Sequence, residues 1–445
     1  MSMVKKLTQD LGRRRAMQTM AVFAAGAAAT AHWNRSYAQS KKVVRVWTTQ
    51  LQPTQMPGKN YYKETFEKAH PGVELQWEQV SDDDAWAKLT AAFAGSNPPD
   101  LVQHLTPALC ATVYDAGNTL PMDDVIKAVG ENEWSPLVKT VFLDKGSYYG
   151  TFIGATAFST MWYRKSKFAE AGVKPMTTWA ESLDAMKKLT KAPVFGHPLT
   201  YKLGGMTDIV TWCLLNKAGG STVDANLNPT LNTQAFVDTL EYLKAMRPYA
   251  PAGASTYSFG ESLTAFVSGA TATAWYTGRT LANVNAQNPS IADDFSAAPW
   301  PSKSPETEFH MSGPHTQFLC KGGKSTAEAK LVAAWQYKPD VYARFLHGAP
   351  GHLLPVTKQG MTNAEYLDHP LLKKYSAEVK VMLAEIDKSN LDVKERPNYK
   401  LNLKMGAIVG ANTFSTAVQK VVIDNMSPKQ AAQEAHDAAA KIMKG

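Results

Sequence analysis

The sequence predicts an α/β fold of sufficient length for two domains. Near the start of the chain, segments that alternate in hydrophobicity and segments with helical spacing follow one another in the order β-α-β-α-β. This order favours a parallel sheet covered by helices. The connections are short and marked by Gly and Pro, as in a compact α/β layer. About 407 residues follow the first 38, which is enough for two ordinary domains with their own cores.

Three strands and two helices make up the first predicted layer. KVVRVWTT (42–49), VELQWEQV (73–80) and DLVQHL (100–105) are strand-like. YYKETFEKAHPG, between the first two strands, has helical spacing and is stopped by His-Pro-Gly at 70–72. AWAKLTAAFAGS, before the third strand, is a helix that the run Ser-Asp-Asp-Asp at 81–84 is expected to cap, because carboxylates stabilise the positive end of a helix dipole.

The rest of the chain is predicted to be mainly helical. WAESLDAMKKLT (179–190) is amphipathic and follows Thr177 and Thr178, either of which can cap it. ATATAWYTG (270–278) is a strand of small residues. The other predicted helices are TDIVTWCLLNKAGG (207–220), TQAFVDTLEYLKAMRPYAP (233–251), ESLTAFVSG (261–269), KSTAEAKLVAAWQY (324–337), PDVYARFLHGAPG (339–351) and the Ala-rich SPKQAAQEAHDAAAKIMKG (427–445).

The amino end carries an export signal. GRRRAMQTMAVFAAGAAATA (12–31) joins basic residues to an apolar run that is too short and too weakly apolar to span a bilayer. Ser36-Tyr37-Ala38 places small residues at alternate positions, as signal peptidase requires. We therefore expect residues 1–38 to be a signal peptide and the protein to be periplasmic. The arginines before a mild, Ala-rich core favour the twin-arginine route.

The charge and the cysteines exclude several classes of protein. Residues 1–38 hold six basic residues and one acidic residue, so their removal lowers the formal charge from +8 to +3. The remaining chain shows no basic stripe of the kind that binds nucleic acid, and no apolar segment long enough to cross a membrane. Cys110, Cys213 and Cys320 form no CxxC pair and fit no zinc pattern, so we expect buried thiols.

No catalytic set is recognisable. CKGGKST (320–326) resembles the end of a phosphate loop, but Phe318 stands where the first glycine would be. His310 and His315 lie in FHMSGPHT without an HExxH motif or a carboxylate cluster. There is no GxSxG motif. We therefore expect no enzymatic activity, no cofactor and no metal.

Polar and aromatic residues instead gather at the expected carboxyl ends of strands, where α/β folds bind ligands. Such residues suit a sugar as the ligand. Aromatic rings can stack on the C–H faces of the sugar, and amides or hydroxyls can form hydrogen bonds with its hydroxyl groups. For Trp47 and Trp162 core packing is the better interpretation, whereas for Trp212, Trp275 and Tyr276 both roles stay open. The residues at predicted strand ends are Thr48, Thr49, Gln50, Gln79, Ser81, Gln103, His104, Thr106, Trp275, Tyr276 and Arg279.

One long segment resembles a known family. YYGTFIGATAFSTMWYRKSKFAEAGVKPMTTWAESLDAMKKLT (148–190) is similar to the central signature of the extracellular solute-binding proteins of carbohydrate ABC importers, family 1. Tyr163-Arg164-Lys165, Phe168, Ala171-Gly172 and Thr178-Trp179 fill its characteristic places. Further matches follow in the family's order over nearly the whole mature chain: FEKAHPGVEL, NPPDLVQH, LLNKAGGSTVD, FVSGATATAWYTG and GAPGHLLPV.

The resemblance implies a two-lobe periplasmic binding protein fold of type II, each lobe a mainly parallel sheet flanked by helices. The lobes would be joined by three hinge crossovers, near residues 155–160, 309–314 and 352–357. Lobe one would comprise 41–156 plus 313–354, and lobe two 157–310 plus 356–445. The implied function is capture of a sugar or sugar-like solute by hinge closure and delivery to an ABC transporter permease in the inner membrane. A monomer is the family's expectation.

Departures from the family pattern leave the ligand open. Arg164 replaces the usual Asn, and Gly278-Arg279-Thr280 stands where many members have a Trp platform. Because arginine can grip a carboxylate or phosphate in two places, an acidic sugar or glycerol-phosphate-type ligand is an alternative. A secreted carbohydrate-active hydrolase is a second alternative, and a receptor for a polyamine, metal or peptide a third. The predicted ligand-binding residues are Thr49, Gln50, Gln79, Gln103, His104, Asp208, Trp212, Trp275, Tyr276, Arg279, His315 and His352.

Overall fold

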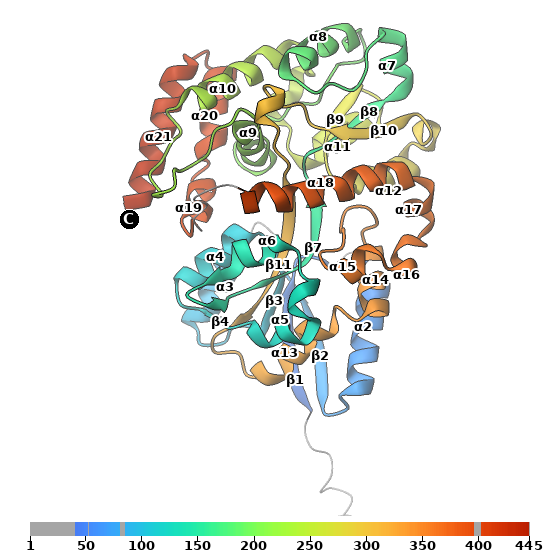
Figure 1. The fold of residues 1–445 in the computed structure, drawn as a ribbon, viewed down its shortest axis with the longest axis vertical. Coiled ribbons are helices and arrows are strands. Elements are labelled where there is room, and N and C mark those ends of the chain that lie inside the picture. Colours follow the sequence, from blue (N-terminus) through green and yellow to red (C-terminus); the bar gives the residue numbers. More distant parts are fainter. Residues whose placement is uncertain (1–40, 52, 81–84, 396–401, 445) are drawn as a thin grey trace, which may run out of the picture.

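The protein forms two α/β bodies stacked end to end, which we call the first lobe and the second lobe (Figure 1). The structure is a computed structural model and describes residues 41–51, 53–80, 85–395 and 402–444. Helix α18 (Ser376–Glu395) lies between the lobes and contacts strands of both. The predicted signal peptide and the predicted cap at 81–84 lie outside the described residues.

The first lobe is built on the predicted parallel sheet. Its strand order is β2-β1-β3-β11-β4, with β7 paired to β11 off this path. β1 pairs in parallel with both β2 and β3, whereas β11 is antiparallel to β3, β4 and β7. The strands are β1 (Lys42–Thr48), β2 (Val73–Gln79), β3 (Leu101–Leu105), β4 (Thr119–Leu120), β7 (Thr151–Ala157) and β11 (Ser312–Cys320).

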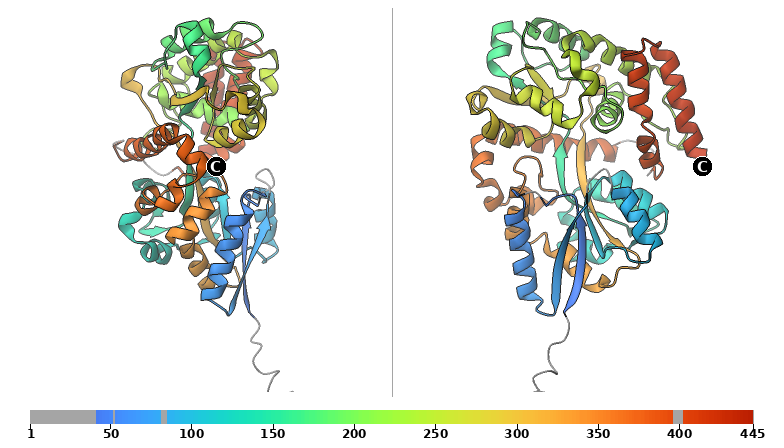
Figure 2. Two further views of the ribbon diagram at one scale, coloured as in Figure 1. Left: turned by 90° about the vertical axis from the view of Figure 1, so that its right-hand side faces the viewer. Right: turned by 180° about the vertical axis from the view of Figure 1, so that it is seen from behind.

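Alternation in β1 sets the core of this lobe. Val44 and Val46 are fully buried and pack in one cluster with Tyr62 and Phe66 of α2. Figure 2 shows α2 running along β1 and β2 on one side of the sheet. The helices of this lobe are α2 (Met56–Ala69), α3 (Ala85–Ala94), α4 (Pro107–Asp115), α5 (Asp123–Val129), α6 (Pro136–Phe142), α13 (Thr326–Trp335), α14 (Pro339–His347), α15 (Lys358–Met361) and α16 (Ala364–Leu367).

The sheet of the second lobe differs from the expectation of a mainly parallel one. Its named strands have the order β10-β8-β9 and all pair antiparallel. The predicted strand 270–278 is only three residues long as β9 (Thr273–Trp275), and its parallel neighbour is reduced to a bridge between Phe195 and Thr271. β8 (Thr160–Arg164) leaves the hinge directly and runs between β9 and β10 (Phe295–Pro299), so both neighbours oppose it.

Helices surround this smaller sheet. Thr178 caps α8 in a capping box with Glu181, as the sequence predicts. The helices are α7 (Lys165–Ala171), α8 (Trp179–Leu189), α9 (Gly205–Lys217), α10 (Gln234–Met246), α11 (Phe259–Val267), α12 (Arg279–Gln287), α17 (Pro370–Lys374), α19 (Met405–Gly410), α20 (Thr413–Val422) and α21 (Pro428–Lys444).

Two strands and one long helix carry the chain between the lobes. β7 leads up from the first sheet into β8, and β11 returns beside it (Figures 1 and 2). Residue Leu354, in the third predicted crossover, pairs with Ala155 of β7. α15 and α16, which follow, still pack on α14. We therefore propose that the chain re-enters the second lobe at α17 and α18 rather than at residue 356.

The described residues also bear on two predictions from composition. Cys110, Cys213 and Cys320 are free and buried, as expected. None of the helices within the described ranges is both long enough and apolar enough to cross a membrane.

Candidate functional site

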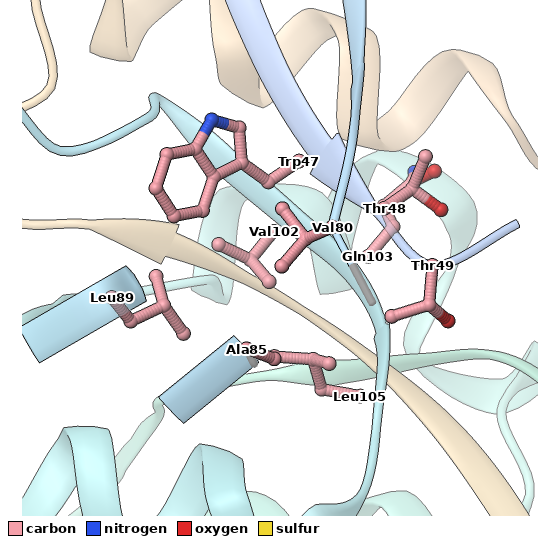
Figure 3. A pocket seen from close by; sticks show the side chains of 9 residues that line it. All are labelled: Trp47, Thr48, Thr49, Val80, Ala85, Leu89, Val102, Gln103 and Leu105. Carbon is pink, nitrogen blue, oxygen red and sulfur yellow. The ribbon is translucent and has the colours of Figure 1, made fainter. Parts of the chain in front are cut away.

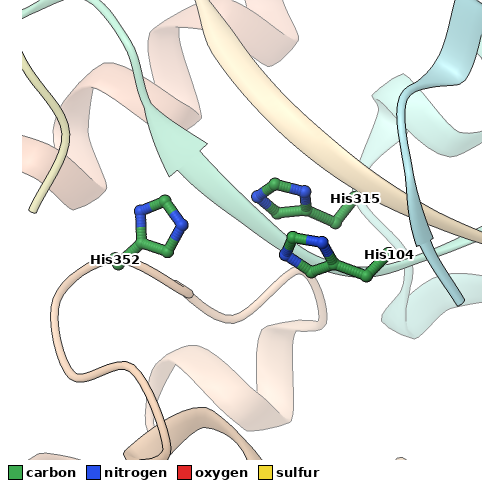
Figure 4. A group of neighbouring side chains, drawn as sticks. All are labelled: His104, His315 and His352. Carbon is green, nitrogen blue, oxygen red and sulfur yellow. The ribbon is translucent and has the colours of Figure 1, made fainter. Parts of the chain in front are cut away.

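Three histidines from distant parts of the chain meet where the first sheet faces the second lobe. His104 lies one residue before the end of β3, His315 lies in β11, and His352 lies in the loop after α14. One ring nitrogen of each lies within 4.8 Å of the others. Figure 4 shows the His104 and His315 rings lying face to face and the His352 ring opposite them. The first two rings are stacked with centroids 3.8 Å apart, whereas the rings of His315 and His352 are 5.7 Å apart.

Thr49, at the end of β1, orients His104. Its Oγ1 lies 2.8 Å from His104 Nδ1 and 3.2 Å from the His104 carbonyl oxygen. His104 has a left-handed backbone with φ of +68°, a conformation that histidine adopts more readily than most residues. In this position the His104 imidazole contacts Thr49 and stacks on His315 of the neighbouring strand β11.

His352 joins the first lobe to the second. Its Nδ1 lies 3.0 Å from Oγ1 of Thr277, which directly follows β9. The backbones also touch, because an ideal Cβ on Gly278 would lie 1.8 Å from the carbonyl oxygen of Gly351. Only glycine fits there, and Gly351 itself has φ of +76°. The site thus lies at a contact between the lobes.

The electrostatics keep these imidazoles neutral. Burial is the main cause that lowers their pKa values, to about 3 for His315 and well below the usual range for His104 and His352. The charge of Arg279 lowers all three pKa values further, and that of Lys59 lowers the pKa of His104. At neutral pH the site therefore presents neutral rings beside a permanent guanidinium charge.

The predicted amides fasten the first lobe together. Gln103 Nε2 donates to Gln317 Oε1 at 3.1 Å and to Gln336 Oε1 at 2.7 Å, while its Oε1 accepts from Lys59 Nζ at 3.1 Å. Gln79 Nε2 donates to the carbonyl oxygen of Thr49 at 3.1 Å. Gln50 is buried and accepts from Gln55. These side chains hold the strand ends in place next to the histidines.

The predicted aromatics of the second lobe lie in or against its core. Trp275 is only 2% exposed and packs against Trp300 at 4.6 Å and His197 at 4.4 Å between ring centroids. Tyr276 is 6% exposed, and burial raises its pKa to about 12. Trp212, on α9, is half-buried beside Phe309.

Asp208 has a structural partner. This carboxylate on α9 is 1% exposed and accepts from the backbone N–H of Ser415 at 2.8 Å and from its hydroxyl at 3.1 Å. It thereby fixes the first turn of α20. Burial raises the pKa of Asp208, and the hydrogen bonds from Ser415 oppose that rise.

Two cavities of very different size lie in the first lobe and beside it. Figure 3 shows a small cavity under the strand ends, lined by Trp47, Thr48, Thr49, Val80, Ala85, Leu89, Val102, Gln103 and Leu105. Its volume of about 10 Å³ has room for one water molecule at most. A larger open hollow of about 470 Å³ lies on the outside of α14 to α17, beside His347 and His369. Neither of these two cavities is lined by His104, His315 or His352.

Sequence reasoning chose the site's residues but did not group them. It selected Thr49, His104, Arg279, His315 and His352, which the structure brings together or links by charge. It missed Thr277, although this hydroxyl sits between the selected Tyr276 and Arg279 at the end of a predicted strand. The role of every predicted residue as a ligand contact, including Trp212, Trp275 and Asp208, remains a prediction.

Comparisons with known proteins give matches to bacterial solute-binding proteins. The family model for bacterial extracellular solute-binding proteins matches residues 51–343. The putative ABC transporter periplasmic-binding protein YcjN of Escherichia coli (strain K12) is 23% identical over 388 residues, 84% of this chain and 86% of that protein.

Solved structures share the fold. The GacH receptor of Streptomyces glaucescens GLA.O, studied unliganded and with acarbose, superposes with a TM-score of 0.73 at 21% identity over 91% of this chain and 99% of that one. A solute-binding protein of Agrobacterium radiobacter K84 in complex with ribitol gives a TM-score of 0.73 at 21% identity over 90% and 98% of the two chains.

Proposed function

The chain belongs to the bacterial extracellular solute-binding proteins, and from this membership we propose that it captures a sugar or sugar-like solute between its lobes for an ABC importer. The observation that carries the proposal is the group of His104, His315 and His352 at the contact between the lobes, joined to the second lobe through Thr277. Acarbose and ribitol in the two structural neighbours support a polyhydroxylated ligand.

The structure supports hinge closure as the mechanism. The first lobe supplies Thr49 and His104 near strand ends, His315 from β11 and His352 from the loop after α14. The segment after β9 supplies Thr277 and Arg279 from the second lobe. A solute that contacts both sets binds the closed form better than the open form and shifts the equilibrium toward it. The closed form is then the one that a permease recognises.

The family also bears on location and activity. Its members are extracellular binding proteins that work with ABC permeases, and they are not enzymes. We propose that this chain is likewise a monomeric periplasmic receptor without enzymatic activity. We also propose that it is exported by the twin-arginine route, because arginines precede its apolar leader segment. A secreted hydrolase would release product from a glycoside, so incubation with oligosaccharides and chromatography of the mixture separates the two functions.

Thermal unfolding with a ligand panel tests the proposal. The panel comprises neutral saccharides, polyols, sugar acids and glycerol phosphates. A ligand that binds only the folded protein at 100 times its dissociation constant adds about 2.7 kcal/mol of stability, which is easily measured. We expect one chemical class to raise the melting temperature. A rise confined to sugar acids or glycerol phosphates would establish the acidic alternative.

A pair of arginine variants locates the binding site. Arg279→Gln should lower the affinity for the responding ligand, because the residue's charge acts on the three histidines. Arg344→Gln, which removes a surface ion pair with Glu365 on the outer face of α14, is the matched control and should leave affinity unchanged. No response to any panel member would contradict the proposal.

A further inference from the structure

Two buried ring nitrogens in the histidine group have no hydrogen-bond partner within the described part of the chain. Nε2 of His104 and Nε2 of His315 are both inaccessible to solvent and form no hydrogen bond with the described residues. Buried polar atoms in proteins nearly always have a partner. Two such atoms in stacked rings, with a third imidazole beside them, indicate that something outside the chain supplies it.

The hydrogen bonds of Thr49 fix which nitrogen of His104 carries the proton. The threonine hydroxyl has one hydrogen, and its oxygen lies close to both the His104 carbonyl oxygen and Nδ1. Both contacts are favourable only if the hydroxyl donates to the carbonyl and accepts from Nδ1–H. His104 Nε2 therefore carries a lone pair. When His352 Nδ1 donates to Thr277 Oγ1 in the same way, Nε2 of that ring also carries a lone pair.

The lone pair of His104 Nε2 favours a Lewis acid as the partner. A metal ion binds only the neutral imidazole, so protons compete with it wherever the ring's pKa is high. An anion, by contrast, would be repelled by the lone pair of His104 Nε2.

The number of lone pairs separates a metal ion from a sugar hydroxyl. A hydroxyl has a single hydrogen and can satisfy one imidazole, whereas a metal ion accepts lone pairs from three at once. Imidazole ligands suit Zn²⁺, Cu²⁺, Ni²⁺ and Fe²⁺, and no carboxylate belongs to this group, which makes Ca²⁺ or Mg²⁺ a poor fit. Three protein ligands also leave a coordination position open, as in zinc sites that bind a further molecule.

We propose that His104, His315 and His352 bind one divalent transition-metal ion, with Zn²⁺ as the reference, and that the ion's open position faces the solute between the lobes. The second part rests on the function proposed above. Thr49 and Thr277 act as positioning residues, because a ligating histidine usually donates its other N–H to a neighbouring acceptor. A solute carboxylate at the open position also comes under the charge of Arg279, which acts on all three histidines.

Binding requires a rotation of at least one ring. The His104 and His315 planes are inclined by only 11°, so their lone pairs run side by side. Zn–N bonds are about 2.0–2.1 Å long, which in a tetrahedron brings the nitrogens to about 3.3 Å from one another. The present spread of up to 4.8 Å contracts to this value when the side chains turn about their own bonds.

Metal titration of the purified protein, after treatment with EDTA, tests the site directly. Calorimetry with Zn²⁺ should show one ion per chain, and Co²⁺ should develop visible ligand-field bands that its hydrated ion lacks. His104→Ala, His315→Ala and His352→Ala should each weaken Zn²⁺ binding by at least about 100-fold. His347→Asn, in the outer hollow, is the control for adventitious surface binding and should bind as the parent does.

Thr49→Val keeps the test valid if a histidine variant fails to fold. It retains all three imidazoles and removes only the acceptor of His104 Nδ1–H, so Zn²⁺ affinity should fall by about 10-fold or more. Thr49→Ser should restore it. The inference is overturned by the absence of stoichiometric binding, by parental affinity in the three histidine variants, or by loss of binding in His347→Asn.

Repeating the solute panel with and without Zn²⁺ separates this inference from the function proposed above. Solutes that stabilise the protein equally in both conditions, with no stoichiometric Zn²⁺ binding, would support the receptor function and overturn the metal site. Stoichiometric Zn²⁺ binding with no solute response in either condition would leave the metal site standing and remove the sugar receptor. Solute affinity that rises with Zn²⁺ supports both.

Discussion

Trp275 ends β9 and Arg279, four positions later, begins α12, and the two residues have different surroundings. Trp275 is enclosed by Trp300, His197 and Tyr242, whereas the charge of Arg279 acts on the histidines between the lobes. A strand end in this lobe therefore serves both the core and the site. The direction of each side chain decides whether the residue packs in the core or acts on the site.

Trp275→Ala should destabilise the ligand-free protein by about 3–5 kcal/mol, since it removes a large buried side chain and leaves a cavity. Denaturant unfolding without ligand measures this directly. The half-buried Trp212 is the comparison, and Trp212→Ala should cost less. An unchanged free energy of unfolding for Trp275→Ala would contradict the placement of this ring in the core.

Lys59 is a buried cation within the first lobe. It is 1% exposed, donates to Gln103 and lies 3.8 Å from the centre of the Trp77 ring. Burial lowers its pKa to about 7. The cost of charging it in the folded state makes stability depend on pH.

The free energy of unfolding should rise between about pH 7 and pH 10 because of Lys59. Over this range the unfolded chain holds a proton that the folded chain has lost, so stability increases with pH by up to about 1.4 kcal/mol per unit. Lys59→Met should abolish this slope. Lys63→Met, one turn further along α2 and paired with Glu67 at the surface, should retain it. Equal slopes in both variants would assign the effect to another group.

At the level of elements, local sequence signals set the ends of helices more reliably than the pairing of strands. The cap of α8 and the Pro-led starts of α4, α14 and α21 follow from residues within one turn. The antiparallel sheet of the second lobe does not, because its strands come from segments far apart in the chain.

Thr178→Ala should lower the free energy of unfolding by about 1 kcal/mol, because it removes the side-chain acceptor for the N–H of Glu181. Thr178→Ser keeps a hydroxyl in the same place and should retain most of the stability. Chemical denaturation of both variants is the measurement. Equal losses would mean that the threonine methyl group, and not the cap, stabilises α8.

For the whole molecule, the contact of Gly278 with Gly351 limits how closely the lobes approach. The Cβ of an alanine at 278 would overlap the Gly351 carbonyl and hold the lobes apart. The site between them depends on that approach, since Thr277 and Arg279 flank Gly278. Closure and binding are therefore coupled through one backbone contact.

Gly278→Ala should destabilise the closed form by about 1–3 kcal/mol and weaken solute binding by about 5- to 150-fold. Calorimetry gives the affinity, and small-angle scattering should show a larger radius of gyration with ligand present. Gly260→Ala, where a Cβ meets nothing within 4 Å, is the control and should bind normally. Parental affinity in Gly278→Ala would mean that this contact is not part of the bound state.

The sequence by itself determined the α/β class, the parallel strands β1 to β3, helices such as α8, α9 and α21, and the family. These depend on periodicity, caps and ordered motifs, which are local or linear properties. Only the tertiary structure decided that Trp275 belongs to the core, that Asp208 fixes α20, and that His104, His315 and His352 meet. Burial and the convergence of side chains depend on how distant segments pack, and that information is not carried by any one stretch of the chain.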